Sequence, residues 1–352
     1  MAADDRDPAR RDGAAADGEV STVPPPAIAP DDRAGSRSDP SRVAASVQGA
    51  SMARAQATLV LLLAAGALLG AAASYASGGL GWAMAALAFV PVLHATLMAV
   101  EFFWARRSNE RDPAGAPAPG RTIVAWWHEL VHAVRVFGLW QPFLSRAPAD
   151  HLPPDAWGRS GVLLIHGFVC NRGLWRRWLH RLTRRGTPFV AVDLEPVFGR
   201  IEDYDTRIEA GVRLLEAATG VPPIIVAHSM GGLATRHWWA SQPTTRIRHL
   251  ITIGSPHRGT RLARLARAPN ARQMREGAAW SAALLARQPR AQHLRTTCFY
   301  AHADNIVFPA SSATLPGADN RHLGAVGHIG MVERPEPFDA LLRLLEQDAT
   351  LT

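Results

Sequence analysis

The fold is decided by the stretch Val226-Ala227-His228-Ser229-Met230-Gly231-Gly232, which follows a short apolar run and precedes a helical pattern. This order predicts a buried strand, a sharp turn that carries Ser229, and a helix. The small residues two positions either side of the serine let the strand and helix backbones approach each other. Ala227 stands where the GxSxG pattern has glycine, and a methyl group is the smallest departure from it. We therefore expect the hydroxyl of Ser229 to be held out at the top of a sheet.

Short apolar runs alternate with helical patterns on both sides of this turn. The alternation predicts an α/β domain over about 161–347, with a mostly parallel sheet and helices on both faces. The expected strands are 162–165, 188–192, 224–227, 249–253, 296–300 and 321–326, and the expected helices are 171–185, 204–219, 230–241 and 335–347.

A serine nucleophile needs partners from elsewhere in the chain. Its hydroxyl is too weakly acidic to attack an ester unaided, so it requires a base within hydrogen-bond reach and a carboxylate that orients the base. In the α/β-hydrolase fold these follow the serine in the order acid, then histidine. Asp304 follows the expected strand 296–300, and His328 follows the last expected strand in a glycine-flanked loop. Both positions are carboxyl ends of strands, where open α/β sheets place their sites.

Other residues compete for the role of the acid. Asp193 precedes the serine turn, and Asp319 follows a Pro-Gly turn rather than a strand, so Asp304 is preferred to both. His302, two residues before Asp304, is expected to have a local structural role.

Acyl transfer also needs N–H donors aimed at the oxyanion that develops on the substrate. The backbone N–H of Met230, directly after the nucleophile, is one expected donor. The loop after strand 162–165 is expected to supply the second at Phe168, because Gly167 lets the backbone turn this amide inward.

These residues resemble bacterial lipases and esterases of the α/β-hydrolase fold, in particular the small Bacillus-type lipases, over about 161–345. Alanine at the first small position of the serine turn is usual in those lipases. The resemblance implies hydrolysis of carboxylic esters through a serine acyl-enzyme, with no cofactor. No counterpart of the calcium loop of larger lipases is evident, so no metal is expected. The resemblance is carried by Ile165-His166-Gly167, the serine turn 227–232, Asp304-Asn305-Ile306-Val307 and Gly327-His328-Ile329-Gly330.

The chain before this domain has a different composition. Residues 1–53 contain almost no large apolar residue, which predicts a disordered tail. Residues 55–100 contain no Asp, Glu, Lys or Arg, and this length accommodates two membrane crossings of about 20 residues each. The turn Ala76-Ser77-Gly78-Gly79 predicts a transmembrane helical hairpin over 54–105, which a linker over 106–121 follows.

The distribution of arginine predicts the orientation of this hairpin. Arg54 precedes it, Arg106 and Arg107 follow it, and the connecting turn carries none. By the positive-inside rule both ends and the hydrolase domain lie on the cytoplasmic side of the inner membrane. Two alternatives remain. One apolar run could be a buried helix of the soluble domain, or translation could start at Met52, with a secretory signal, a single anchor and the catalytic part outside.

Residues 122–160 are expected to form an amphipathic juxtamembrane helix and a connector. Within them His128-Glu129-Leu130-Val131-His132 matches the HExxH pattern, whose two histidines could bind zinc with Glu129 as the base. The alternative is a chance match on the polar face of a helix. We favour the chance match over a metalloprotease, since no third ligand is evident and a complete serine site lies downstream.

Charge and cysteine content limit the remaining classes of function. The net charge is +8, and all the cations are arginines. No nucleic-acid module is recognisable, so nucleic acid is not an expected partner. Cys170 and Cys298 are too few for a disulfide framework.

An insertion over about 260–292 could be a moving lid or a fixed cap on the acyl pocket.

The interpretation that fits these patterns is a membrane-anchored serine carboxylester hydrolase. Its expected partners are a hydrophobic acyl ester substrate and the lipid bilayer. The alternatives are a membrane protein that binds a ligand or partner without hydrolysis, and an acyltransferase with the same triad.

Overall fold

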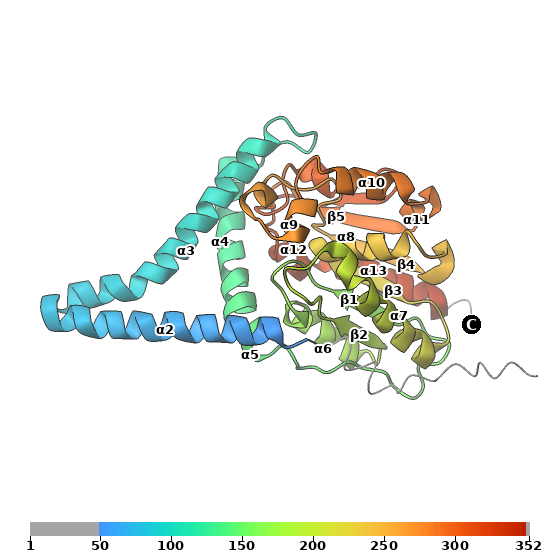
Figure 1. The fold of residues 1–352 in the computed structure, drawn as a ribbon, viewed down its shortest axis with the longest axis horizontal. Coiled ribbons are helices and arrows are strands. Elements are labelled where there is room, and N and C mark those ends of the chain that lie inside the picture. The colour runs from blue at the N-terminus through green and yellow to red at the C-terminus, as the bar shows by residue number, and fades with distance from the viewer. Residues whose placement is uncertain (1–48, 350–352) are drawn as a thin grey trace, which may run out of the picture. The chain divides into compact units, whose positions relative to one another are not determined.

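The computed structural model describes residues 49–349 of the 352-residue chain. The tail expected over residues 1–53 therefore lies almost wholly outside the described residues. The described part consists of a sheet with helices on both faces, preceded by two long helices and a shorter one (Figure 1).

The strands form one parallel sheet in the order β2-β1-β3-β4-β5-β6. The first five confirm the expected strands to within one residue at each end, and the parallel α/β architecture is confirmed with them. The bounds are β1 Val162–Ile165, β2 Phe189–Val192, β3 Ile224–His228, β4 His249–Ile253, β5 Thr296–Tyr300 and β6 Asp319–His322.

The prediction of the sixth strand over 321–326 is wrong in position. β6 lies at the edge of the sheet and pairs with β5 alone among the described strands. Three of its four residues are exposed, so the strand lacks the apolar signal by which a buried strand is recognised. The apolar Leu323 and Val326, which suggested the longer strand, follow it and pack against the core.

Helices cover both faces of the sheet, because alternate strand residues point to opposite faces. Leu163 and Ile165 of β1 join one apolar cluster, and Val162 and Leu164 join the other. Strands that are buried on both faces are apolar throughout, which is the pattern seen in the sequence. The covering helices are α7 (Asp205–Thr219) and α8 (Met230–Trp239) on one face, and α6 (Arg176–Arg184) and α13 (Pro335–Ala349) on the other.

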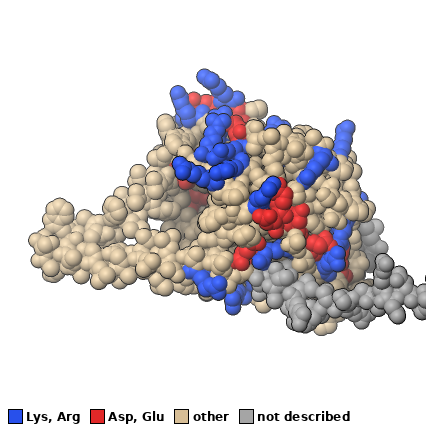
Figure 2. Space-filling view, viewed as in Figure 1, with Lys and Arg blue, Asp and Glu red and all other residues tan. Residues whose placement is uncertain are grey.

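Two long helices, α2 (Ser51–Gly78) and α3 (Leu80–Asn109), form a hairpin that turns at Gly79. They contain 28 and 30 residues and are long and apolar enough to cross a membrane. Leu69 and Trp82 are 72% and 68% exposed, which is not expected of helices buried in a soluble domain. Figure 2 shows uncharged residues over the outer part of the hairpin, whereas arginines and carboxylates gather over the α/β domain.

The next helix, α4 (Pro119–Arg135), lies between the hairpin and the sheet (Figure 1). It continues as a π-helical segment, Val136–Trp140, and a short α5, Gln141–Phe143. Ala125 and Ala133 of α4 pack in one cluster with Met98 and Phe102 of α3. The exposed residues of α4 include Arg121 and His128 and an apolar set, Ile123, Val124, Trp127, Val131 and Val134.

Hydrogen bonds join both long helices to the α/β domain. The side-chain amide of Gln56 in α2 donates to the carbonyl oxygen of Val169 at 3.1 Å. At the end of α3, Asn109 donates to the carbonyl oxygen of His302 and accepts from the N–H of Ala310, both at 2.8 Å. The hairpin therefore contacts the domain through the start of α2 and the end of α3.

Candidate active site

Ser229 occupies a strained turn between β3 and α8, as the sequence predicts. Its φ of 54° and ψ of −128° are rare for a residue with a side chain. A Cβ on Gly231 would lie 2.5 Å from the carbonyl oxygen of His166 and 2.8 Å from that of Ile165. Only glycine fits there, so the missing side chain lets α8 start directly against the end of β1. This strained backbone conformation turns Ser229 out of the strand and toward a cavity.

His328 and Asp304 are hydrogen-bonded to each other. The distance between His328 Nδ1 and Asp304 Oδ2 is 3.0 Å, and both side chains are buried. The other carboxylate oxygen of Asp304 accepts the N–H groups of Ile306 and Val307 at 2.9 and 2.8 Å. Asp304 is thereby fixed by its own loop after β5, and it in turn fixes the ring of His328.

The charges around His328 favour its protonated form. Burial disfavours the imidazolium, but the carboxylates of Asp304 and Glu129 outweigh this effect and raise the pKa of His328 above its usual value. The ring of His228 lies 4.5 Å away, centre to centre. Burial holds the pKa of His228 well below its usual value, so this neighbour stays neutral. A base beside a fixed carboxylate is the arrangement required to accept a proton from serine.

The residues expected to supply the oxyanion donors, Met230 and Phe168, come from elements that adjoin Ser229. Met230 is the first residue of α8, where backbone N–H groups have no partner within the helix. The Gly167-Phe168 loop follows β1, and a Cβ on Gly167 would lie 2.7 Å from the Cβ of Ser229. The glycine therefore permits the close approach that brings the Phe168 backbone beside the serine.

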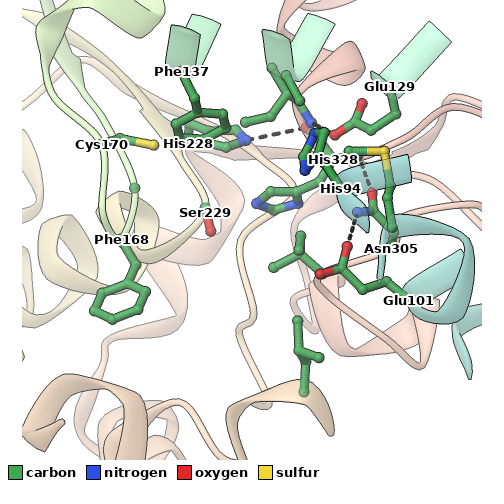
Figure 3. Close-up of a pocket in the computed structure, with 16 residues that line it drawn as sticks. His94, Glu101, Glu129, Phe137, Phe168, Cys170, His228, Ser229, Asn305 and His328 are labelled. Carbon is green, nitrogen blue, oxygen red and sulfur yellow. Dashed lines mark hydrogen bonds between the residues drawn. The ribbon is translucent and has the colours of Figure 1, made fainter. Parts of the chain in front are cut away.

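A cavity of about 300 Å³ joins these elements (Figure 3). Ser229, His328 and Phe168 lie on its wall, and most other wall residues are apolar. Helices α3 and α4 close the side opposite the sheet. The lining residues are His94, Met98, Glu101, Glu129, Ala133, Phe137, Gly167, Phe168, Cys170, His228, Ser229, Leu262, Asn305, Ile306, His328 and Ile329.

Residues 162–326 match the model of the alpha/beta hydrolase family. This stretch begins with β1, contains Ser229 and Asp304, and ends two residues before His328. The match covers a little under half of the chain and lies wholly within the α/β domain. The family match and the parallel sheet confirm the sequence resemblance and the predicted fold class.

Several solved structures are similar to the hydrolase domain. The mature form of a Bacillus licheniformis lipase is 18% identical with a TM-score of 0.48, over 56% of this chain and 95% of that one. Lipase B of Aspergillus fumigatus is 21% identical with a TM-score of 0.46, over 54% of each chain. A naproxen esterase of Bacillus subtilis is 14% identical with a TM-score of 0.38, over 55% of this chain and 85% of that one. No curated protein matches by sequence.

The two other acid candidates lie outside the hydrolase cavity. Asp193 follows β2, and its carboxylate accepts the N–H of Arg172 at 2.7 Å. Asp319 begins the edge strand β6, where it is exposed and pairs with Arg321 at 2.6 Å. Of the three aspartates, Asp304 is the one whose carboxylate is hydrogen-bonded to His328 among the described residues.

His302 and the cysteines also have defined surroundings in the hydrolase domain. His302 packs edge-on against His322 with the ring centres 4.7 Å apart. Cys170 and Cys298 are free and buried. Burial raises the pKa of Cys170, which lines the cavity, to about 12, so its thiol stays protonated near neutral pH.

The insertion over 260–292 is packed into the hydrolase domain. Leu284 is part of the core cluster, and the side-chain amide of Asn270 donates to the hydroxyl of Tyr204 at 3.0 Å. Trp280 donates its indole N–H to Glu202 at 2.7 Å. These contacts hold the insertion against the rest of the domain in this structure. The insertion contains α9 (Pro269–Gln273) and α10 (Ala279–Arg287), and α11 (Arg290–Leu294) extends past its end.

Sequence reasoning missed the contribution of α3 and α4 to the cavity wall. His94, Met98 and Glu101 come from a segment predicted only to anchor the chain, and Glu129 and Phe137 from one predicted to lie at the membrane interface. The signals in the sequence were Glu101, a carboxylate directly after the uncharged run, and Glu129 within HExxH.

Proposed function

We propose that the protein is a membrane-anchored serine carboxylester hydrolase that acts on hydrophobic acyl esters through an acyl-enzyme. Ser229 is the nucleophile, His328 the general base and Asp304 the residue that orients it. The backbone N–H groups of Met230 and Phe168 form the oxyanion hole. The observation that carries the proposal is that Ser229, with its strained backbone, lines the same cavity as His328, whose ring is hydrogen-bonded to Asp304.

The geometry suits a two-step transfer of the acyl group. His328 takes the proton of Ser229 as the hydroxyl oxygen attacks the ester carbonyl carbon, and the two amides stabilise the oxyanion. The ester C–O bond then breaks, and His328 gives its proton to the leaving alcohol. Water repeats the sequence against the acyl-enzyme, which releases the carboxylic acid and restores Ser229. Asp304 keeps the Nδ1 proton in place and stabilises the imidazolium in both steps.

The surroundings of the cavity support a hydrophobic substrate. Met98, Phe137, Leu262 and Ile329 contribute apolar surface to the wall, and apolar walls favour acyl chains through the hydrophobic effect. The two apolar helices would keep the domain at a bilayer, where such esters concentrate. We place both crossings in the inner membrane and the hydrolase domain on its cytoplasmic side.

Turnover of p-nitrophenyl esters by the purified full chain tests this function. Ser229→Ala is expected to lower kcat by a factor of about 10⁴ or more, because the triad acts as a unit. Ser311→Ala, at a serine that bonds to Asp112 outside the cavity, is the matched control and is expected to keep wild-type turnover. Equal residual rates in wild type and Ser229→Ala would overturn the proposal.

A fluorophosphonate probe separates the hydrolase from a protein that binds a ligand without hydrolysis. An activated serine forms a covalent bond to such a probe, and a passive one does not. We expect labelling of the wild type and none of Ser229→Ala. A wild-type chain that stays unlabelled would support the binding protein instead.

A further inference from the structure

Helix α4 directs a carboxylate into the hydrolase domain. Glu129, in the middle of the segment that matches HExxH, is only 2% exposed. Its Oε1 accepts the N–H of Ile329 at 2.7 Å, and its Oε2 accepts the N–H of Gly330 at 2.8 Å. These are the two residues directly after His328. Both carboxylate oxygens of Glu129, which the HExxH pattern would make the base of a zinc site, are thus bound by backbone N–H groups.

The loop around His328 is shaped to receive this carboxylate. A Cβ on Gly327 would lie 2.5 Å from Glu129 Oε2 and 2.8 Å from the Cβ of Glu129. A Cβ on Gly330 would lie 3.2 Å from the same oxygen. The two glycines that flank His328 therefore leave the space that Glu129 fills.

A second carboxylate reaches the same loop through an intermediary. The side-chain amide of Asn305 donates to Glu101 of α3 at 2.8 Å, and its oxygen accepts the N–H of His328 at 3.2 Å (Figure 3). Three consecutive amides, those of residues 328, 329 and 330, are thus held by α4 directly or by α3 through Asn305. The segment before the hydrolase domain fixes the backbone that carries the base.

Burial of Glu129 carries a cost that packing alone does not justify. Burial raises the pKa of this carboxyl to about 7, against the opposing effect of the two amide donors. An apolar side chain would fill the same volume without the loss of hydration. Hydrogen bonds from backbone N–H groups to a buried carboxylate are strong and directional. Such bonds can hold the loop, and with it His328, in one position.

We infer that Glu129 is a positioning residue of the active site, and that docking of α4 on the domain is a condition for activity. This inference rests on the proposed function. Glu129 acts on the reaction through the backbone after His328 and does not replace Asp304 as the partner of its ring. Helix α4 is therefore a working part of the hydrolase and not only a connection to the hairpin.

The electrostatic surroundings of His328 supply a readout specific to this role. The ring is faced by Asp304 from the loop after β5, by Glu129 from α4, by Glu101 from α3 and by the neutral His228 from β3. The carboxylate of Glu129 raises the pKa of His328. Without this charge the pKa of His328 falls, so the acid limb of kcat/KM against pH moves to lower pH.

The experiment compares Glu129→Gln, Glu129→Asp and a matched control in the purified full chain. The control is Asp112→Asn, because Asp112 also joins the segment before the domain to a domain loop, through the N–H and hydroxyl of Ser311. For Glu129→Gln we expect kcat to fall about tenfold to a hundredfold with KM little changed, as for a misplaced catalytic group, and the acid limb to move to lower pH. Glu129→Asp keeps the charge and is expected to keep the wild-type acid limb, with a smaller loss of kcat. Asp112→Asn is expected to change neither.

Three outcomes would overturn the inference. If Glu129→Gln keeps the kcat and acid limb of the wild type while Ser229→Ala is inactive, Glu129 has no positioning role and the proposed function stands. If Glu129→Gln and Asp112→Asn lose activity equally and in proportion to their melting temperatures, Glu129 serves packing alone. If the wild type neither turns over ester nor reacts with a fluorophosphonate, the proposed function fails and the inference fails with it. If Glu129→Gln does not fold, Glu129→Asp alone tests the role of the charge. Because Glu129→Asp keeps the negative charge, an acid limb that differs from the wild type would contradict the inference.

Discussion

The backbone of Ser229 is kept in its strained form by its neighbours, since a positive φ costs a residue with a side chain about 1–3 kcal/mol. Its N–H donates to the carbonyl oxygen of Ile253 at 2.9 Å, which ties the turn to β4. Gly231 removes the clash that would otherwise separate α8 from β1. The reactive geometry therefore depends on atoms that take no part in the reaction.

Gly231→Ala tests this dependence. The added methyl group would meet two carbonyl oxygens that belong to fixed backbone, so we expect a loss of about 1–3 kcal/mol in the free energy of unfolding and slower labelling of Ser229 by a fluorophosphonate. Gly120→Ala is the matched control, because no atom lies within 4 Å of its added Cβ in α4. Wild-type stability and labelling in Gly231→Ala would contradict this account of the turn.

The pH dependence of ester hydrolysis tests the pair formed by His328 and Asp304. A base works in its neutral form, so kcat/KM rises with pH through the pKa of His328, which lies above its usual value of about 6.5. Asp304→Asn removes the carboxylate that favours the imidazolium, and we expect the acid limb to move to lower pH and kcat to fall about 10⁴-fold. Asp319→Asn, at the exposed aspartate of β6, is expected to match the wild type. An unchanged acid limb in Asp304→Asn would rule out the pairing.

Local patterns predicted that Ser229, Asp304 and His328 would lie at one edge of the sheet, because the carboxyl ends of parallel strands share an edge. Ser229 and Asp304 follow β3 and β5, whereas a loop separates His328 from β6. The position of β6 was not predictable in the same way, because an edge strand that is exposed carries no apolar periodicity. The role of Glu129 was hidden as well, since its partners are backbone amides 200 and 201 residues further along the chain.

At the scale of elements, α3 and α4 contact the α/β domain and also form segments that were predicted to have another role. From composition, α3 was predicted to be part of a membrane anchor and α4 to connect the anchor to the domain. Composition indicates whether a surface favours water or lipid, but it does not indicate which residues contact each other. Their inward sides carry the polar residues Glu101, Asn109 and Glu129, each of which bonds to the hydrolase domain. Such contacts form between segments distant in sequence, so no local pattern indicates them.

Asn109→Ala tests the attachment of α3 to the hydrolase domain. The substitution leaves the buried N–H of Ala310 and the carbonyl oxygen of His302 without this partner, and each unsatisfied group costs about 1–3 kcal/mol. We expect a lower melting temperature of the full chain in detergent. Thr96→Ala removes a bond within α3 that does not reach the domain, to the carbonyl oxygen of Val92, and is expected to change the melting temperature less. Equal melting temperatures for the two variants would mean that Asn109 does not secure the helix.

At the scale of the whole molecule, the proposed orientation in the membrane would determine which esters the proposed hydrolase can reach. Reporter fusions test the proposed cytoplasmic side. A reporter active only in the periplasm is expected to give no signal after residue 352 and a strong signal when inserted at Gly79, the turn of the hairpin. Strong activity of the fusion after residue 352 would overturn the orientation and would favour a start of translation at Met52.

Helix α4 faces a carboxylate inward and a set of apolar residues outward, which is the reverse of an ordinary surface helix. Removal of residues 49–118 would take away the part of the cavity wall that α3 supplies and would leave the exposed apolar residues of α4 without the neighbouring helices. The shortened protein would have an open cavity bordered by exposed apolar surface. It would be prone to aggregate and could not shield the proposed acyl-enzyme from water. Trimming the proposed anchor to make the protein soluble would therefore also remove His94, Met98 and Glu101 from the cavity wall.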